Sequence, residues 1–277
     1  MKNNKSKTEK KTAVKNETDN KKPVLFVGAG PGDPELITVK GRRALAAADM
    51  IIYTGSLVPE AVLKWTDPKS IRMNSASMHL EQIVDKMTAE YSQGRKVVRL
   101  HTGDPSLYGA IFEQMAQLRR RSIPYRVIPG VTAAFAAAAA MGIEYTLPEI
   151  CQTLILTRMS GRTPVPEAEQ LALLAAHRAS MAIYLSIGLI DQVADILEDA
   201  YGPDGTCAVV FRASQPEEKI IYTKTVSLSH TVKTENITHQ ALIIVGRVLD
   251  ISVETLRYTS KLYDMNFAHG YRSDQSR

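Results

Sequence analysis

Two turns rich in glycine, aspartate and proline constrain the fold more than any other feature of this sequence. Residues 28–34 (GAGPGDP) follow the apolar run 24–27, and residues 102–105 (TGDP) follow the apolar run that begins at Val97. Proline cannot continue a strand, and apolar residues at intervals of three and four after the second turn predict a helix. A strand, a polar turn and a helix in this order are typical of a parallel α/β sheet, in which ligands bind at the carboxyl ends of the strands.

The first turn does not match the known phosphate-binding motifs. A dinucleotide-binding loop has the pattern Gly-x-Gly-x-x-Gly, but position 33 is Asp33, and Pro31 and Pro34 keep the loop extended. Thr38 is the expected N-cap of the helix that follows. A P-loop is excluded here as well, because the turn lacks Gly-Lys-Ser/Thr.

Alternating apolar runs and helical patterns predict an α/β protein with two αβα units, a mainly parallel first sheet and a mixed second sheet. In the first unit, residues 23–142, we expect strands at 24–28, 50–54, 96–101 and 125–128, and helices at 38–48, 56–65, 78–93, 107–121 and 131–141. In the second unit, residues 143–250, we expect strands at 152–157, 181–185, 207–211, 220–222 and 241–245, and helices at 167–177 and 189–200. The helix at 131–141 is almost pure alanine, so we expect it to pack closely against the first sheet. Residues 251–277 form a C-terminal extension.

The positive charge of the chain is confined to its first residues. Residues 1–22 hold eight lysines and three acids, which account for the whole net charge of +5, so residues 23–277 are neutral. This segment has almost no apolar residues, which predicts a disordered, solvated tail. The neutral body argues against a nucleic-acid partner.

Cysteine usage and hydropathy exclude several further classes of protein. Cys151 and Cys207 form no CxxC motif, which argues against a zinc site or a redox pair and favours reduced thiols in a cytoplasmic protein. No apolar run reaches the roughly 20 residues that a membrane span needs. We therefore expect no metal and no membrane partner.

Three motifs in the same order and spacing identify a family resemblance. Together with residues 28–34 and 102–105, residues 129–133 (PGVTA) resemble the tetrapyrrole (corrin and porphyrin) methylases, which use S-adenosylmethionine and release S-adenosylhomocysteine. The resemblance covers roughly residues 23–250. It implies two α/β domains with the cofactor in the cleft between them, a tetrapyrrole substrate and a homodimer.

Narrower motifs resemble the branch of this family that acts in cobalamin biosynthesis. These motifs are residues 53–59, 74–78, 100–104, 145–149, 161–167 and 211–216. They imply methylation of precorrin-4 or cobalt-precorrin-4 at C-11. Thr54 stands where relatives that methylate uroporphyrinogen carry aspartate, which argues against that reaction. The alternatives are another corrin-pathway C-methyltransferase, an rRNA or diphthamide methylase, and a non-enzymatic tetrapyrrole carrier.

The resemblance also assigns candidate site residues. The expected cofactor-binding residues are Pro31, Thr102, Gly103, Asp104, Leu107, Thr132, Ala133, Leu185 and Ala213. The expected substrate-binding residues are Gly32, Asp33, Ser56, Asn74, Ser75, Arg158, Arg162 and Arg212, because a polycarboxylate needs cationic and hydroxyl donors. No catalytic residue is assigned, because an electron-rich substrate carbon can attack the methyl group itself. For Asp33 and Asp104, a role in fixing the loop by hydrogen bonds to the backbone is the alternative.

Overall fold

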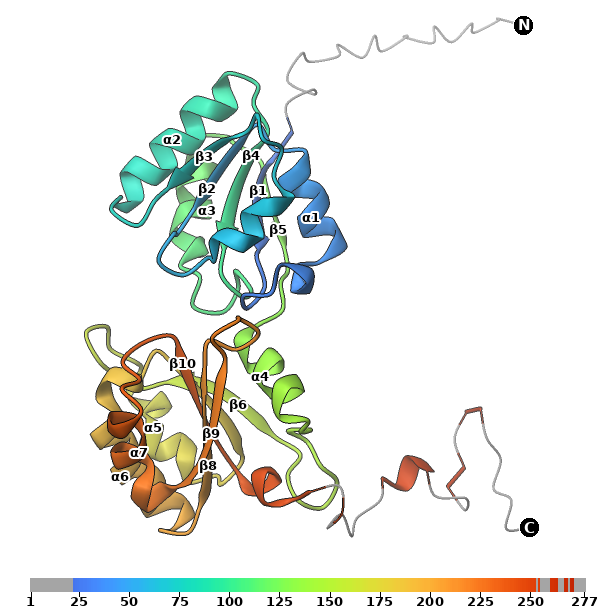
Figure 1. Cartoon of the computed structure of the whole chain (residues 1–277). Coiled ribbons are helices and arrows are strands. Elements are labelled where there is room, and N and C mark those ends of the chain that lie inside the picture. The colour runs from blue at the N-terminus through green and yellow to red at the C-terminus, as the bar shows by residue number, and fades with distance from the viewer. Residues whose placement is uncertain (1–21, 253, 255–259, 264–266, 269, 272–277) are drawn as a thin grey trace, which may run out of the picture.

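The chain folds into two α/β units, each built on a five-stranded sheet (Figure 1). The computed structural model describes residues 22–252, 254, 260–263, 267–268 and 270–271. The expected fold class, with a parallel first sheet and a mixed second sheet, is confirmed. Apart from Lys22, the predicted tail lies outside the described residues, as does most of the predicted C-terminal extension.

The first sheet is entirely parallel, with the strand order β3-β2-β4-β1-β5. Its strands are β1 (Val24–Gly28), β2 (Met50–Tyr53), β3 (Ile71–Asn74), β4 (Val97–His101) and β5 (Tyr125–Ile128). One face is covered by α1 (Val39–Ala46) and the 3-10 helix Glu60–Trp65, and the other by α2 (Leu80–Ser92) and α3 (Ile111–Arg120) (Figure 1). As expected, the side chain of Thr38 caps α1 by accepting a hydrogen bond from the backbone N–H of Gly41.

The second sheet has the order β6-β7-β10-β8-β9, in which β6 and β7 are parallel and the other neighbours antiparallel. Its strands are β6 (Leu154–Arg158), β7 (Ser180–Tyr184), β8 (Thr206–Phe211), β9 (Lys219–Lys224) and β10 (Ala241–Val245). Helices α5 (Leu171–Ala175), α6 (Ile190–Tyr201) and α7 (Leu228–Thr234) lie on one face of this sheet. Short 3-10 helices are formed by Pro34–Leu36, Glu167–Glu169, Ile187–Leu189, Thr225–Ser227, Arg247–Asp250 and Lys261–Tyr263.

The alanine-rich helix α4 (Ala133–Met141) packs against the second sheet, and the prediction that it covers the first sheet is wrong. Its buried alanines belong to one core cluster with Ala182, Ala208 and Leu242 of the second sheet. Small residues on both sides let the helix and the sheet approach closely. The packing of α4 therefore places it in the second unit. The turn before it, at residues 129–132, connects the two units.

Two of the strands and α-helices escaped prediction, and three predicted helices differ in form, one of which, at 167–177, is divided into the 3-10 helix Glu167–Glu169 and α5. The predicted elements did not include β3 or α7. The predicted helix at 56–65 is a 3-10 helix from Glu60 to Trp65, and the predicted helix at 107–121 begins only at Ile111. Tyr108 and Ala110 have φ angles of 55° and 46°, which place a turn before α3. In the described part of the chain, every helix is too short or too polar to cross a membrane.

Candidate active site

Glycines allow three loops to pack directly on one another at the carboxyl ends of β1, β4 and β5. A Cβ atom on Gly28 would lie 2.6 Å from the Cα of Gly130, and one on Gly130 would lie 2.1 Å from the carbonyl oxygen of Gly103. Both distances are far below any van der Waals contact, so only glycine fits at these two positions. The three sequence motifs therefore form one continuous floor between the units.

The carboxylates of the two turns are engaged with the backbone. Asp104 accepts hydrogen bonds from the N–H groups of Ser106 (2.7 Å) and Gly130 (2.8 Å), one on each oxygen. Asp33 accepts one from the N–H of Glu35 (2.8 Å). Asp104 thus ties the loop after β4 to the loop after β5, and Asp33 caps a 3-10 turn. These contacts match the loop-fixing alternative for both residues.

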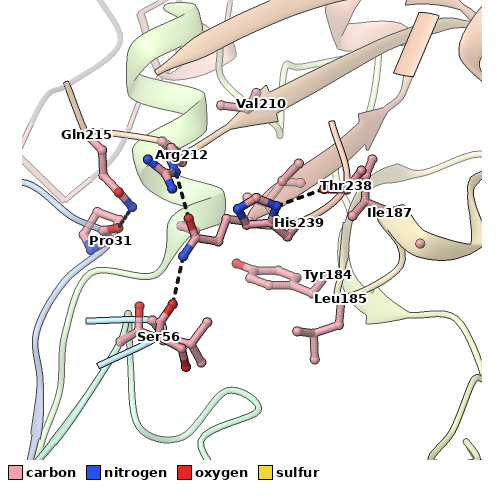
Figure 2. A pocket seen from close by; sticks show the side chains of 18 residues that line it. Pro31, Ser56, Tyr184, Leu185, Ile187, Val210, Arg212, Gln215, Thr238 and His239 are labelled. Carbon is pink, nitrogen blue, oxygen red and sulfur yellow. Dashed lines mark hydrogen bonds between the residues drawn. The ribbon is translucent and has the colours of Figure 1, made fainter. Parts of the chain in front are cut away.

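A cavity of about 530 Å³ lies above this floor and receives residues from both units (Figure 2). We call it the cleft cavity. From the first unit it is lined by Pro31, Ser56, Leu57 and Thr102. From α4 and the second sheet it is lined by Ala133, Tyr184, Leu185, Ile187, Gly188, Val210, Arg212, Ala213, Gln215, Thr238, His239, Gln240, Ala241 and Leu242. Its volume is typical of small-molecule sites.

Hydrogen bonds between the units close one side of the cleft cavity. The side-chain amide of Gln240 donates to the carbonyl oxygen of Ser56 (2.9 Å) and accepts from the Nε of Arg212 (2.8 Å) (Figure 2). The amide of Gln215 donates to the carbonyl oxygen of Pro31 (3.2 Å). These contacts fix the first unit against the strand ends of β8 and β10.

Several residues at the cavity have unusual backbone conformations. Leu185, Arg212 and Gln240 have φ angles of 54°, 48° and 50°, in the left-handed region that non-glycine residues seldom occupy. The side chain of Leu185 is also 69% exposed although it is apolar. Backbone strain of this kind persists where the surrounding packing imposes it, and it is concentrated at ligand and active sites.

The N-terminus of α4 borders the cleft cavity through Ala133. The phenol oxygen of Tyr184 accepts a hydrogen bond from the N–H of Ala134 (2.9 Å) and lies 2.7 Å from the hydroxyl of Thr132. Burial raises the pKa of Tyr184, so the phenol stays neutral. Because a helix N-terminus carries partial positive charge, this end of the cavity suits a carboxylate.

A second cavity of about 460 Å³ opens between the end of β4 and the start of α3, and we call it the trough cavity. It shares Leu57 and Thr102 with the cleft cavity. Its other lining residues are Thr54, Ser75, Ala76, Met78, Leu80, Ile83, Arg99, His101, Leu107, Tyr108, Gly109, Ala110, Glu113 and Gln114. The two cavities are therefore neighbours, with Leu57 and Thr102 in the wall of both.

Buried polar groups form the floor of the trough cavity. Arg99, 4% exposed, donates hydrogen bonds to Gln114 (3.2 Å), Ser75 (3.0 Å) and the carbonyl oxygen of Ile52 (3.3 Å). Burial lowers its pKa to about 10. Burial and then the charge of Arg99 lower the pKa of His101 to about 3, so this imidazole is neutral at physiological pH.

The structure brings most of the expected site residues to these cavities. Of the expected cofactor residues, Pro31, Thr102, Ala133, Leu185 and Ala213 line the cleft cavity. Leu107 lines the trough cavity, whereas Gly103, Asp104 and Thr132 lie in the supporting loops.

The expected substrate residues are more dispersed. Ser56 and Arg212 line the cleft cavity and Ser75 the trough cavity, while Gly32 and Asp33 line an adjoining hollow. Asn74, Arg158 and Arg162 line neither of the two cavities. Arg158 instead donates to the carbonyl oxygens of Thr163 (2.9 Å) and Pro164 (2.8 Å) in its own loop.

Sequence reasoning missed Arg99, His101, Tyr184, Gln215 and Gln240. A signal existed for the first two, because a charged and a titratable residue alternate with apolar ones in a strand that is otherwise buried. Gln215 lies in the motif 211–216, but nothing local indicates the partners of Gln215 and Gln240, which are more than 180 positions away in the sequence.

Comparison with known proteins assigns the chain to a class. Residues 23–228 match the family described as Tetrapyrrole (Corrin/Porphyrin) Methylases. The chain belongs to this family, and the predicted resemblance is confirmed.

Its relatives include two curated methyltransferases of high identity. The cobalt-precorrin-4 C(11)-methyltransferase of Methanocaldococcus jannaschii is 49% identical over 260 residues, which cover 94% of this chain and 99% of that protein. The precorrin-4 C(11)-methyltransferase of Pseudomonas aeruginosa is 45% identical over 249 residues, which cover 90% of this chain and 98% of that protein.

Two solved structures resemble the fold. The X-ray structure of a cobalt precorrin-4 methyltransferase matches with a TM-score of 0.80 and 44% identity, covering 82% of this chain and 96% of that chain. A uroporphyrin-III C-methyl transferase from Thermus thermophilus, complexed with S-adenyl homocysteine, matches with a TM-score of 0.69 and 25% identity, covering 83% of this chain and all of that chain.

Proposed function

We propose that this protein transfers a methyl group from S-adenosylmethionine to C-11 of precorrin-4 or of cobalt-precorrin-4 in cobalamin biosynthesis. The observation that carries the proposal is the 49% identity over 94% of the chain to a cobalt-precorrin-4 C(11)-methyltransferase. The two adjoining cavities support it, because a methyl transfer needs two ligand sites that meet at one point. The two cavities share Leu57 and Thr102 in their walls.

The cleft cavity suits S-adenosylmethionine. Leu185, Val210 and Leu242 offer an apolar wall for the adenine ring. The N-terminus of α4 at Ala133 offers a partly positive site for the carboxylate of the methionine part. The bound cofactor supplies a methyl group on a cationic sulfur. The trough cavity then holds the tetrapyrrole, with Arg99 as the cation nearest its floor.

The protein acts in this proposal by alignment and by excluding water. The substrate carbon contributes the electron pair of the new carbon–carbon bond, the sulfur keeps the pair of the broken bond, and the substrate ring loses a proton. Holding the two ligands in line can supply roughly 7–11 kcal/mol of the barrier without a nucleophile from the protein. The bonds from Gln240 and Gln215 between the units keep the two binding surfaces in register.

Incubation of the purified protein with S-adenosylmethionine and each form of precorrin-4, generated in situ by upstream enzymes, tests the proposal. We expect one methyl group to be added, seen by mass spectrometry, and its position to be C-11 by carbon-13 NMR with a labelled methyl donor. Addition at another ring carbon would instead favour a different corrin-pathway C-methyltransferase. The same assay shows which of the two substrates is preferred.

We also propose that the protein is a cytoplasmic homodimer. Light scattering of the purified chain tests the oligomeric state, and fractionation of cells that express it tests the compartment.

A further inference from the structure

His101 has a buried nitrogen with no partner in the protein. Within the described part of the chain, its Nε2 is the buried side-chain nitrogen or oxygen that lacks a hydrogen bond. The residue is 6% exposed and lines the trough cavity. Since nearly all buried polar atoms in folded proteins are paired, an unpaired one at a cavity wall indicates a place for a ligand atom.

The strand explains why His101 lies at this wall. Side chains alternate along a strand, so Val97, Arg99 and His101 point to the face of the sheet covered by α2 and α3. Val97 belongs to the core on this face, and beyond it the core gives way to the trough cavity. The imidazole also stacks on Phe26, with ring centroids 5.9 Å apart, which restricts the ring plane.

The surrounding charges favour a neutral imidazole. Arg99 lies two residues away on the same face, and its guanidinium is bonded to neutral acceptors, including Gln114 and Ser75. No described carboxylate lies within ion-pair distance of the Arg99 guanidinium. The other titratable groups that line the trough cavity are Tyr108 and Glu113. A neutral imidazole can accept or donate one hydrogen bond at Nε2, depending on its tautomer.

We propose that the Nε2 of His101 forms a hydrogen bond with a ring nitrogen of the tetrapyrrole and thereby sets which ring carbon faces the cleft cavity. This inference rests on the proposed function. Its support is positional, because His101 directly precedes Thr102, one of the two residues that line both cavities. The tetrapyrrole presents ring nitrogens at its centre and carboxylates at its edge. A neutral imidazole on the floor of the trough cavity can form a hydrogen bond with a ring nitrogen, whereas a carboxylate would favour a cation.

Three substitutions separate the hydrogen bond from a structural role. In His101→Gln the side-chain amide reaches the place of Nε2, in His101→Asn it is too short, and His101→Leu removes the polar group. We expect His101→Asn and His101→Leu to lower kcat/KM for the tetrapyrrole by roughly tenfold to a hundredfold. His101→Gln should retain activity within about fivefold, and the dissociation constant of S-adenosylhomocysteine should stay within about twofold in all three. His230→Leu, the same change at an exposed histidine of α7, is the control.

Several outcomes would overturn the inference. Full turnover by a folded His101→Asn variant is one, and a parallel loss of S-adenosylhomocysteine affinity, which indicates a structural role, is another. If His101→Leu does not fold, the contrast between Gln and Asn still decides. If the wild-type protein methylates neither form of precorrin-4, the proposed function fails. The inference is then judged separately by absorbance titration with uroporphyrin, a stable carboxylated tetrapyrrole: unchanged binding by His101→Asn would overturn it.

Discussion

Gly30 and Gly103 pair through both of their backbone groups, although they belong to different turns. The N–H of Gly103 donates to the carbonyl oxygen of Gly30 (2.8 Å), and the N–H of Gly30 donates back (3.3 Å). Both residues have positive φ angles, 81° and 59°, respectively. The pair locks the turn after β1 to the turn after β4, and Pro31 and Thr102 beside it both line the cleft cavity. The two motifs that stand out in the sequence are thus one structural unit.

Gly103→Val is expected to weaken S-adenosylhomocysteine binding by more than tenfold while the circular dichroism spectrum stays native. A new Cβ would make only ordinary van der Waals contact, 3.8 Å from the Cα of Thr132, so the fold can accept it while the side chain stands beside Thr102 at the cavity wall. A β-branched residue is also strained at this φ. Gly94→Val is a matched control, because Gly94 has a φ of 79° and open surroundings in the loop after α2. Equal affinities for Gly103→Val and Gly94→Val in calorimetry would show that Gly103 does not border the cofactor.

Gln240→Ala is expected to raise the dissociation constant of S-adenosylhomocysteine by roughly threefold to tenfold. It removes the bond to Ser56 and leaves the Nε of Arg212 without that acceptor, each of which contributes about 0.5–1.5 kcal/mol. Gln152→Ala is the control, since the amide of Gln152 also donates to backbone carbonyls but lies outside both cavities. If both variants bind equally well, the link between the units does not contribute to the site.

The sequence predicted the elements that local pattern determines. Apolar strands bounded by glycine and proline were found to within one or two residues, as for β1, β5 and β10. β3 was missed because it is a short edge strand whose side chains are mostly exposed, so it lacks an apolar run. α7 was missed because serine and threonine dilute its helical pattern, and its packing rests on Leu228 and Val232, four residues apart.

The loops of the site were predictable from their motifs, whereas Leu185 and Arg212 of the second unit were expected only through the family resemblance. The loops around Pro31, Thr102 and Ala133 carry glycine and proline in patterns that reveal their geometry. The second unit contributes Leu185, Arg212 and Gln240 through left-handed backbone conformations that tertiary packing imposes. The place of α4 was mispredicted for the same reason, because an alanine helix has no apolar stripe to show which sheet it covers.

Asp104→Asn is expected to raise KM for S-adenosylmethionine by roughly tenfold with little change in kcat. Each oxygen of Asp104 accepts a backbone N–H, and an amide has one acceptor, so either Gly130 or Ser106 loses its partner at a cost of about 1–3 kcal/mol. The loop after β5 would shift, and with it the start of α4. Initial-rate kinetics at varied cofactor concentration measure the change, and an unaltered KM would contradict the role of Asp104.

Asp33→Asn is expected to lower kcat by about tenfold or less. Its Oδ1 accepts one bond from Glu35, which an asparagine oxygen can also accept, so the loss is one of charge rather than of shape. A positioned general base gives about 100- to 10,000-fold. A fall of more than about a thousandfold, with both ligands still bound, would make Asp33 an acid–base residue and refute catalysis by alignment alone.

We expect the folded protein to become less stable as the pH decreases from 7 to 5, because of His101. Burial, together with the charge of Arg99, lowers its pKa from 6.5 to about 3 in the folded state. In the unfolded chain His101 is protonated below about pH 6.5, whereas in the folded chain it is protonated only below about pH 3. Protonation therefore favours the unfolded state, and stability is lost as the pH falls from 6.5 towards 3. At pH 5 the loss amounts to roughly 2 kcal/mol.

Thermal unfolding of the wild type and of His101→Gln between pH 7 and pH 5 measures this contribution. Glutamine does not titrate, so the Tm of His101→Gln should decrease less between pH 7 and pH 5 than that of the wild type. The Tm of the control His230→Gln should decrease as much as that of the wild type. A lower Tm of the variant at pH 7 does not affect the comparison, because the prediction concerns the slope of Tm against pH. An equally steep decrease in His101→Gln would show that His101 titrates alike in the folded and the unfolded protein, and the burial effect on its pKa would have to be abandoned.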